Sequence, residues 1–479
     1  MYVESGIYGL QEIYKKITKR FLFNEYVIKD EFDVFVAFET MNNRGKRLSD
    51  LELLKNRLIY LTTLYTDKEL PPADRKSLRD MINSAWKEVY HQLGRNDKRP
   101  LNDDDFLKAH WIMYFQYPRK KGNDYIKFLL DEHFSPQKVH KKVERDVVLE
   151  LPEEKRTFFE IDELDGDNWN DDETVIETKA LLQPIQIRDY VNSLKESAVH
   201  WFNSHYPHLA NELTDEEKNA LDTLNRIGMG YFRPLVMSVF KNEKDTSKRT
   251  DFLNHIEKFI FVVFRLNQAR SNYRDSEFYN ASREFNKNEL TIEQIKTKLY
   301  NATTNYFHDD GTFNSKYFYD YLYKRFNSGE RKGYYGWHGL RYFLYEYELK
   351  LLSQSRQKKV SWEDLLKTAE DKVSIEHVFP QTLTDGWKEP FSALDEKDYP
   401  LYGGSLGNLL LLSMSINSSL QNDAFGEKKE PRFNNAGEKI RNGYSDGSHS
   451  EIEIAQYNEW TPEHIKERGL RLLNFMEER

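Results

Sequence analysis

A carboxylate and an imidazole stand side by side in the segment VSIEHVFPQ, at Glu376 and His377. They close a short β-branched run, and Pro380 follows three residues later. A neutral imidazole, whose ordinary pKa is about 6.5, can take a proton from water at neutral pH. A carboxylate oxygen is a preferred ligand of a hard cation such as Mg²⁺. These residue types suit hydrolysis of a phosphodiester, in which a base activates water and a cation offsets negative charge. The pair alone is equally explained by a surface histidine, so the rest of the chain must decide.

Two asparagines follow this pair. Asn408 precedes the apolar segment LLLLS, and Asn417 comes nine residues after Asn408. Mg²⁺ keeps several waters and needs few protein oxygens, so Glu376 and Asn417 could serve as its ligands. Neighbouring residues of a strand face opposite ways, so Glu376 and His377 can meet at one phosphate only where the strand bends. We expect Pro380 to end the strand and to help set that bend.

Short strands and a helix must hold these residues. The run before His377 predicts one strand, and the apolar residues 406–413 predict a second. A helix is expected around Asn417, so that the order is strand, turn, strand, helix. A closing helix is predicted after Thr461 and Pro462, because threonine is a good cap and proline suits the first helical position.

The rest of the chain predicts a mainly α protein. A helix with leucines at helical spacing should begin at Ser49, and a β-like run precedes it at residues 32–38. Residues 66–139 and 179–360 continue as helices whose tyrosines and phenylalanines favour a core over a base-stacking platform. Residues 140–178 differ, with seven acids between Asp162 and Glu173. Their spacing is not that of an EF-hand, so a solvated linker or insertion is favoured over a metal or partner role.

Composition excludes several classes of protein. The 479 residues carry a net charge of -9 and no cysteine. The chain as a whole is therefore not a basic nucleic-acid binder, and disulfides, Cys-type zinc sites and thiol nucleophiles are ruled out. A zinc hydrolase is disfavoured, since no His-x-x-x-His motif occurs. No apolar run approaches a membrane span and no signal peptide is visible, so we expect no membrane partner and a cytoplasmic location.

The segments EHVFPQ and LGNLLLLSMSIN resemble the His-Me finger (HNH) nucleases, specifically the GmrD-type domain of GmrSD-like type IV restriction enzymes. The resemblance implies a C-terminal ββα-metal domain that acts on double-stranded DNA. It implies that Glu376 and Asn417 bind a divalent metal, Mg²⁺ or Mn²⁺. It further implies that His377 is the general base, that Asn408 orients the catalytic loop and that Lys428 contacts a phosphate.

The segment FVAFETMNNRGKRLSDLELLKN, residues 35–56, resembles the closing motif of the ParB-like GmrS-type domain, which is associated with nucleotide hydrolysis. The upstream DGQQR motif of that domain does not occur. We therefore expect the N-terminal part to be missing, and a nucleotide triphosphate to act only in a longer chain. Asn43, Arg44 and Lys46 form a donor-rich turn that could hold an anion or nucleotide. A helix-leading turn with solvated basic residues explains them equally well.

A basic segment with flanking aromatics, KRFNSGERKGYYGWHGLRYF, occurs in the middle of the chain. Arg331 and Lys332 in it are candidates for DNA contact. Solvated surface charge is the alternative, and His338 is favoured as a packing or surface histidine.

Five regions are predicted on this basis. They are a GmrS-type remnant (1–65), a helical region (66–139), an acidic linker or insertion (140–178), a helical middle region (179–360) and an HNH nuclease domain (361–479). The predicted function is a metal-dependent DNA endonuclease or nickase of an anti-phage restriction system, controlled by DNA modification. By resemblance, the trigger is a modified cytosine for GmrSD-like enzymes and a phosphorothioate mark for SspE-like relatives. The alternative is a non-catalytic DNA-binding or nucleotide-regulated scaffold subunit of a defence complex. A missing GmrS-type region or a partner subunit is the expected protein partner.

Overall fold

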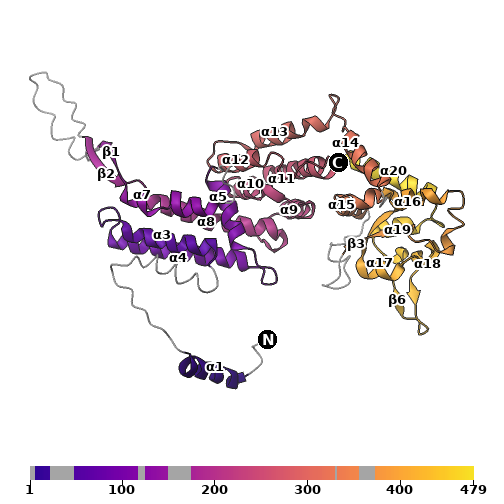
Figure 1. The fold of residues 1–479 in the computed structure, drawn as a ribbon, viewed down its shortest axis with the longest axis horizontal. Coiled ribbons are helices and arrows are strands. Elements are labelled where there is room, and N and C mark those ends of the chain that lie inside the picture. The colour runs from indigo at the N-terminus through magenta and orange to yellow at the C-terminus, as the bar shows by residue number, and fades with distance from the viewer. Residues whose placement is uncertain (1–5, 22–47, 117–123, 149–173, 329–331, 355–372) are drawn as a thin grey trace, which may run out of the picture. The chain divides into compact units, whose positions relative to one another are not determined.

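The structure is a computed structural model that describes residues 6–21, 48–116, 124–148, 174–328, 332–354 and 373–479 (Figure 1). It is mainly helical, as predicted. The chain divides into two compact units, Met1–Leu107 with Asn123–Lys195, and Lys108–Gly122 with Glu196–Arg479. Within the described ranges, no helix combines the length and hydropathy that a membrane crossing needs.

The first unit is built around two long helices, α3 (Asp50–Leu64) and α4 (Pro72–Gly94), which lie side by side (Figure 1). The predicted cap is confirmed: the side chain of Ser49 accepts a hydrogen bond from the Glu52 N–H, and Glu52 accepts one from the Ser49 N–H. The indole of Trp86 is fully buried and donates to the Leu51 carbonyl at 3.0 Å. The other elements are α1 (Gly6–Arg20), α5 (Asp103–Tyr114), α6 (Tyr125–Lys127), η2 (Phe128–His133), α7 (Pro136–His140), β1 (Lys142–Val148), β2 (Thr174–Ala180) and α8 (Pro184–His205), of which α5 and α8 continue into the second unit.

Several sequence predictions fall outside the described residues. The β-like run at 32–38 and the anion-binding candidates Asn43, Arg44 and Lys46 lie there. So does the acidic run between Asp162 and Glu173. The antiparallel strands β1 and β2 flank the undescribed residues 149–173.

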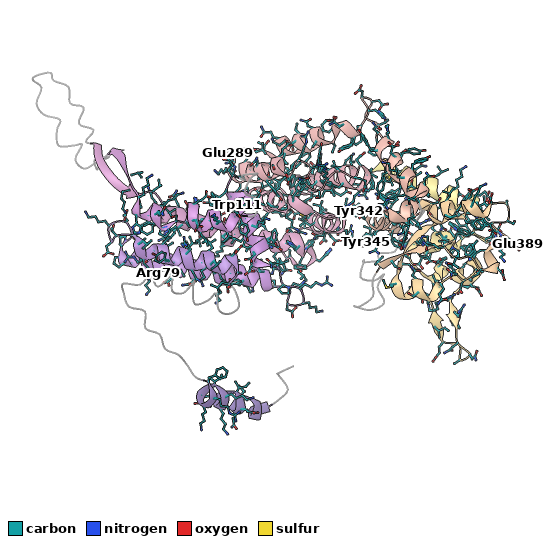
Figure 2. The ribbon with its side chains drawn as sticks, in the orientation of Figure 1. Arg79, Trp111, Glu289, Tyr342, Tyr345 and Glu389 are labelled. Atoms are coloured by element: carbon teal, nitrogen blue, oxygen red, sulfur yellow. The ribbon has the colours of Figure 1, made fainter. Side chains whose placement is uncertain are left out.

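Residues 196–354 of the second unit form what we call the helical body. Its aromatic residues are mostly core, as predicted: Phe232, Phe259 and Phe278 are buried with ring centroids 4.8–5.4 Å apart. Tyr342 and Tyr345 of α15 lie in the same core (Figure 2). The elements are η4 (Pro207–Leu209), α9 (Asp215–Ile227), η5 (Gly230–Phe232), α10 (Arg233–Asn242), α11 (Thr246–Ile260), η6 (Phe261–Leu266), α12 (Asp275–Asn286), α13 (Ile292–Thr303), η7 (Thr304–Tyr306), α14 (Lys316–Asn327), η8 (Gly333–Gly336) and α15 (Leu340–Gln354).

Residues 373–479, which we call the C-terminal region, contain a two-stranded antiparallel sheet. Strand β3 (Val373–His377) pairs in register with β4 (Leu409–Ser413), from Val373 opposite Ser413 to His377 opposite Leu409. The predicted second strand is thus shorter than expected, because residues 406–408 form a helical turn. The other elements are η9 (Asp385–Trp387), η10 (Glu396–Asp398), α16 (Tyr399–Gly403), η11 (Leu406–Asn408), α17 (Met414–Leu420), α18 (Phe425–Lys429), β5 (Arg432–Phe433), β6 (Lys439–Arg441), η12 (Tyr444–Asp446), α19 (His449–Ala455) and α20 (Pro462–Glu478).

This sheet separates two hydrophobic cores. On one face, Val373, Leu409 and Leu411 join the core of the helical body. On the other face, Leu410 and Leu412 join a second core inside the C-terminal region. The alternation follows from strand geometry, because successive side chains point to opposite faces. Apolar residues on both faces explain why LLLLS lacks the polar alternation of a half-exposed strand.

Helices α19 and α20 fix the C-terminal region. The buried carboxylate of Glu348, on α15, accepts hydrogen bonds from the His449 and Ser450 N–H groups at the start of α19, at 2.7 and 2.8 Å. Thr461 caps α20 and Pro462 takes its first turn, as predicted. Fully buried Arg468 of α20 donates to the carbonyls of residues 407 and 409, and so holds the start of β4.

Candidate active site

His377 is the last residue of β3, and its side chain is half-buried. Its ring centroid lies 4.7 Å from that of Tyr335, at an interplanar angle of 51°. Its Nε2 lies 3.2 Å from the amide nitrogen of Gln381. Burial, together with the nearby charge of Lys428, lowers the pKa of His377 to about 4. The imidazole is therefore neutral at pH 7, as a base that accepts a proton must be.

The Gln381 amide determines which ring nitrogen carries the proton. With its nitrogen toward His377, Gln381 donates to Nε2 and the proton sits on Nδ1. With the amide rotated by 180°, its oxygen accepts from Nε2–H and leaves the Nδ1 lone pair for a water. The side-chain amide that contacts this ring is thus that of a glutamine, four residues after the histidine.

Asn408 is fully buried and precedes Leu409, the residue opposite His377 in the sheet. Its Oδ1 accepts from the Phe379 N–H at 2.7 Å and from the Trp460 indole at 3.2 Å. Its Nδ2 donates to the carbonyls of Phe379 and Gly403, at 2.9 and 3.2 Å. The side chain thus ties down the chain two residues after His377, which is the position an orienting residue needs. Its catalytic importance stays a prediction.

Glu376 is 3% exposed and forms a buried ion pair with Lys428, which is 0% exposed. Oε1 of Glu376 lies 2.7 Å from the Lys428 ammonium and accepts from the Tyr444 hydroxyl at 2.9 Å. The ammonium also donates to the carbonyls of His377 and Val378, at 3.1 and 3.2 Å. Burial raises the pKa of Glu376, and the ammonium and the hydroxyl oppose that rise. Burial beside this carboxylate also raises the pKa of Tyr444.

Glu376 and His377 have their contacts on opposite sides of β3. The strand pairs in register through both residues, without the bend that their convergence requires. Glu376 contacts Lys428 and Tyr444 of the C-terminal region, whereas His377 contacts Tyr335 of the helical body. The two side chains therefore do not form one cluster in this arrangement.

Asn417 lies half-buried on α17, as the predicted helix requires. Its Nδ2 donates to the Ser374 hydroxyl at 2.9 Å and to the Ile375 carbonyl at 3.1 Å. These bonds fix α17 against β3. Within the described residues Oδ1 accepts no hydrogen bond, so this oxygen has the chemistry of a metal ligand.

The predicted Mg²⁺ ligand set does not fit this arrangement well. A hard cation needs accessible oxygens, but Glu376 is buried and its charge is already offset by Lys428. Among the described residues, no three histidine, aspartate or glutamate side chains form a group that could hold a metal. The roles of Glu376 and Asn417 as ligands stay predictions, and we assign no chemical step to a metal.

The remaining predicted contacts are placed as follows. Lys428 uses its three ammonium hydrogens inside the protein, so a phosphate contact would require this segment to rearrange. Lys332 is exposed, three residues before Tyr335, and Arg331 lies outside the described residues. Tyr335 and Gln381 were not identified as site residues from the sequence. Both lie within quoted motifs, but nothing in their spacing shows that they contact His377.

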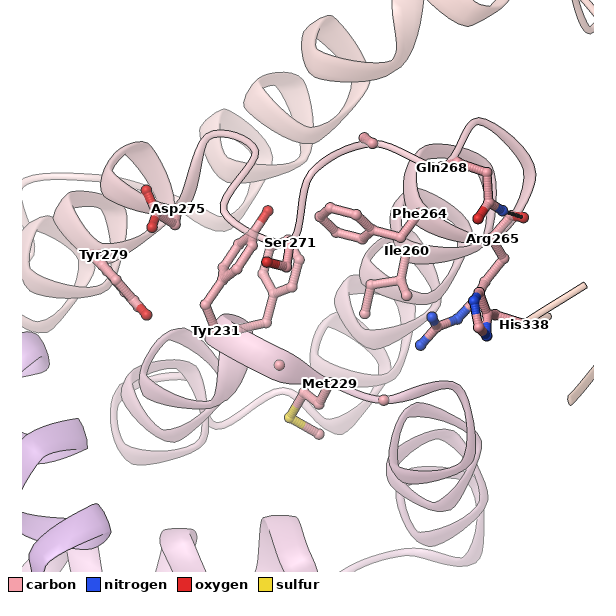
Figure 3. Close-up of a pocket in the computed structure, with 14 residues that line it drawn as sticks. Met229, Tyr231, Ile260, Phe264, Arg265, Gln268, Ser271, Asp275, Tyr279 and His338 are labelled. Atoms are coloured by element: carbon pink, nitrogen blue, oxygen red, sulfur yellow. Dashed lines mark hydrogen bonds between the residues drawn. The ribbon is translucent and has the colours of Figure 1, made fainter. Parts of the chain in front are cut away.

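A separate pocket of about 440 Å³ lies in the helical body (Figure 3). Arg265 and His338 lie at one end of it, and Asp275 and Tyr279 at the other (Figure 3). Its rim includes Gln268, a non-glycine residue with a φ of 51°. None of the predicted catalytic or metal-binding residues lines this pocket.

Residues 274–475 match the family model of the C-terminal domain of GmrSD restriction endonucleases. The match runs from the residue before α12 into the last turn of α20, and so includes β3, β4 and every described candidate residue of the site. It supports a GmrSD-like restriction endonuclease. No curated protein matches the chain.

Proposed function

We propose that this chain is a DNA endonuclease of an anti-phage restriction system, with His377 as its general base. The observation that carries the proposal is the family match over the region in which a neutral histidine ends β3, beside the fully buried Asn408. The order β3, β4, α17 supports assignment to the HNH, ββα-metal class.

Each residue has a task in this proposal. His377 takes a proton from the attacking water through Nδ1, which requires the Gln381 amide to turn by 180° so that its oxygen, in place of the nitrogen that now lies 3.2 Å from Nε2, accepts from Nε2–H. Asn408 holds residues 378 and 379 through hydrogen bonds to their backbone. These bonds fix the backbone from which the His377 ring extends. The Glu376–Lys428 pair fixes the same loop from the other face of the sheet, through the carbonyls of His377 and Val378.

Lys332 supports the choice of DNA as substrate. It is exposed, and it lies in the segment that carries Tyr335 to His377. Exposed lysines of a DNA-binding segment contact backbone phosphates. The dependence on DNA modification, and the choice between a cut and a nick, are part of the proposal but rest on the resemblance alone.

The test is conversion of supercoiled plasmid to open-circular or linear DNA. Wild type is assayed with Mg²⁺, with Mn²⁺ and with EDTA, on DNA with and without glucosylated cytosine. His377→Ala is the test variant and His338→Ala, at an exposed histidine of the helical body, is its matched control. We expect wild type and His338→Ala to cleave and His377→Ala to lose cleavage by at least about 100-fold. Equal cleavage by all three proteins would refute the role of His377. Binding of DNA without cleavage under every condition would favour the scaffold alternative.

A further inference from the structure

One side chain of the helical body reaches the candidate base. Tyr335 lies on η8, and its ring contacts the ring of His377 at 4.7 Å between centroids. Tyr335 is 40% exposed, so its ring does not belong to either core. The contact joins two segments more than forty residues apart in sequence.

The segment that carries Tyr335 is held firmly. Two residues later, the buried indole of Trp337 donates to the Arg265 carbonyl at 2.6 Å and packs against Phe318 with centroids 5.2 Å apart. Before Tyr335, the Tyr334 N–H donates to the Gly404 carbonyl at 2.9 Å. Tyr335 is therefore anchored to the helical body on one side and to the C-terminal region on the other.

Glycine makes this close approach possible. Gly333 begins η8 with a φ of 50°, a conformation that side chains with a Cβ rarely adopt. A Cβ there would collide with the ring of Phe326 and would lie 2.7 Å from the Gly404 carbonyl oxygen. The backbone of η8 thus lies directly against residue 404, four residues before Asn408.

We propose that Tyr335 is a positioning residue for His377, so that the helical body completes the active site of the nuclease proposed above. His377 lies on the same strand face as Val373, which packs on the helical body. The Tyr335 ring closes one side of the imidazole, while Gln381 binds its Nε2. Together these two contacts, one on the ring face and one at Nε2, restrict the orientation of the imidazole. The inference rests on the proposed function, but the contact itself can be tested without activity.

The experiment compares Tyr335→Leu, Tyr335→Phe and Tyr323→Leu in the full chain. Tyr323 is the matched control, because it is a tyrosine of the helical body that is 57% exposed and lies on α14. The first measurement is the rate at which diethyl pyrocarbonate modifies His377, read by mass spectrometry of the peptide that contains it. The second is the kcat and KM of plasmid cleavage, and thermal unfolding checks that each variant is folded.

We expect Tyr335→Leu to speed modification of His377 several-fold and to lower kcat by about 10-fold to 100-fold, with KM nearly unchanged. Tyr335→Phe and Tyr323→Leu should match wild type in both measurements, because the first keeps the ring and the second does not touch the site. The proposal is overturned if diethyl pyrocarbonate modifies His377 in Tyr335→Leu at the same rate as in wild type. It is also overturned if KM rises while kcat holds, since that result would assign Tyr335 to DNA binding. Faster modification in a chain that cuts no DNA at all would confirm the contact and refute only the proposed function.

Discussion

Lys428→Met tests whether the buried ion pair of Glu376 and Lys428 stabilises the end of β3 that carries His377. The substitution keeps most of the side-chain volume and removes the ammonium. Glu376 then remains 3% exposed, with the Tyr444 hydroxyl as its remaining side-chain donor. The carbonyls of His377 and Val378 lose a hydrogen bond each. Breaking a buried pair by removing one partner costs about 3–5 kcal/mol.

Protonation of Glu376 limits this cost and makes it depend on pH. From an ordinary pKa of 4.5, neutralising the carboxyl at pH 7 takes 2.5 pH units, or about 3.4 kcal/mol. At pH 5.5 the same step takes one unit, or about 1.4 kcal/mol. In the variant the folded-state pKa of Glu376 lies above the unfolded value, so stability is lost as pH rises. The charge part of the penalty should therefore shrink by about 2 kcal/mol between pH 7 and pH 5.5.

Hydrogen exchange on the peptide that covers β3 measures this locally. At pH 7 we expect its protected amides to exchange about 100-fold faster in Lys428→Met than in wild type, after correction for the intrinsic rates. The double variant Glu376→Gln with Lys428→Met removes both charges and should recover part of that loss. A Lys428→Met protein with wild-type exchange at both pH values would refute the view that the pair supports the strand. A penalty that does not change with pH would show that lost packing, rather than an unpaired carboxylate, is responsible.

Three further predictions concern stability. Gly333→Ala should lower the free energy of unfolding by urea by about 2–3 kcal/mol and should reduce DNA cleavage, since its Cβ meets Phe326 and Gly404. The control Gly437→Ala has a φ of 78° but no atom within 4 Å of its Cβ, so it should lower that free energy by only about 1 kcal/mol. Asn408→Asp places an acceptor against the carbonyls of Phe379 and Gly403, so we expect the folded state to lose about 3 kcal/mol or more of stability. This loss would be measured as a lower Tm, and an unchanged Tm would contradict these two hydrogen bonds. Burial raises the pKa of Glu451 to about 8, so wild type should lose stability as pH rises from about 5 through 8, by up to about 5 kcal/mol. Glu451→Gln should flatten that profile in a series of urea unfolding curves, and parallel profiles would refute the assignment.

Local signals made much of the fold predictable. Ser49 and Thr461 are side-chain caps at the starts of α3 and α20, and Pro462 suits the first turn of α20, so the sequence alone predicts both helices. LLLLS was short and apolar enough to be identified as a strand. Its exact start was missed because Gly407, Asn408 and the turn they form are held by α20, some sixty residues away. A Cβ at Gly407 would collide with the Ile465 carbonyl, and no local pattern reveals such a contact.

The candidate site was predictable in composition but less so in geometry. Glu376 and His377 were identified from residue type, whereas the orienting role of Asn408 was implied by the resemblance to His-Me finger nucleases and stays a prediction. The pairing of Glu376 with Lys428 and Tyr444 depends on where α18 and η12 pack, and their distances in sequence do not encode it. Strand alternation alone did indicate that Glu376 and His377 face apart. The structure keeps that alternation, because β3 pairs without a bulge.

The two-sided burial of the β3–β4 sheet affects how this region can be cut out or exchanged. A fragment that began near residue 361 would keep both strands but would expose Val373, Leu409 and Leu411 to water. It would also lose Glu348, which binds the first N–H groups of α19. The strands that hold His377 are thus buried on both faces within the second unit. They do not form the surface of a domain that could fold by itself. Grafting or recombination at this boundary should yield aggregating protein, whereas a boundary before α12 keeps the helix α15 that the sheet requires.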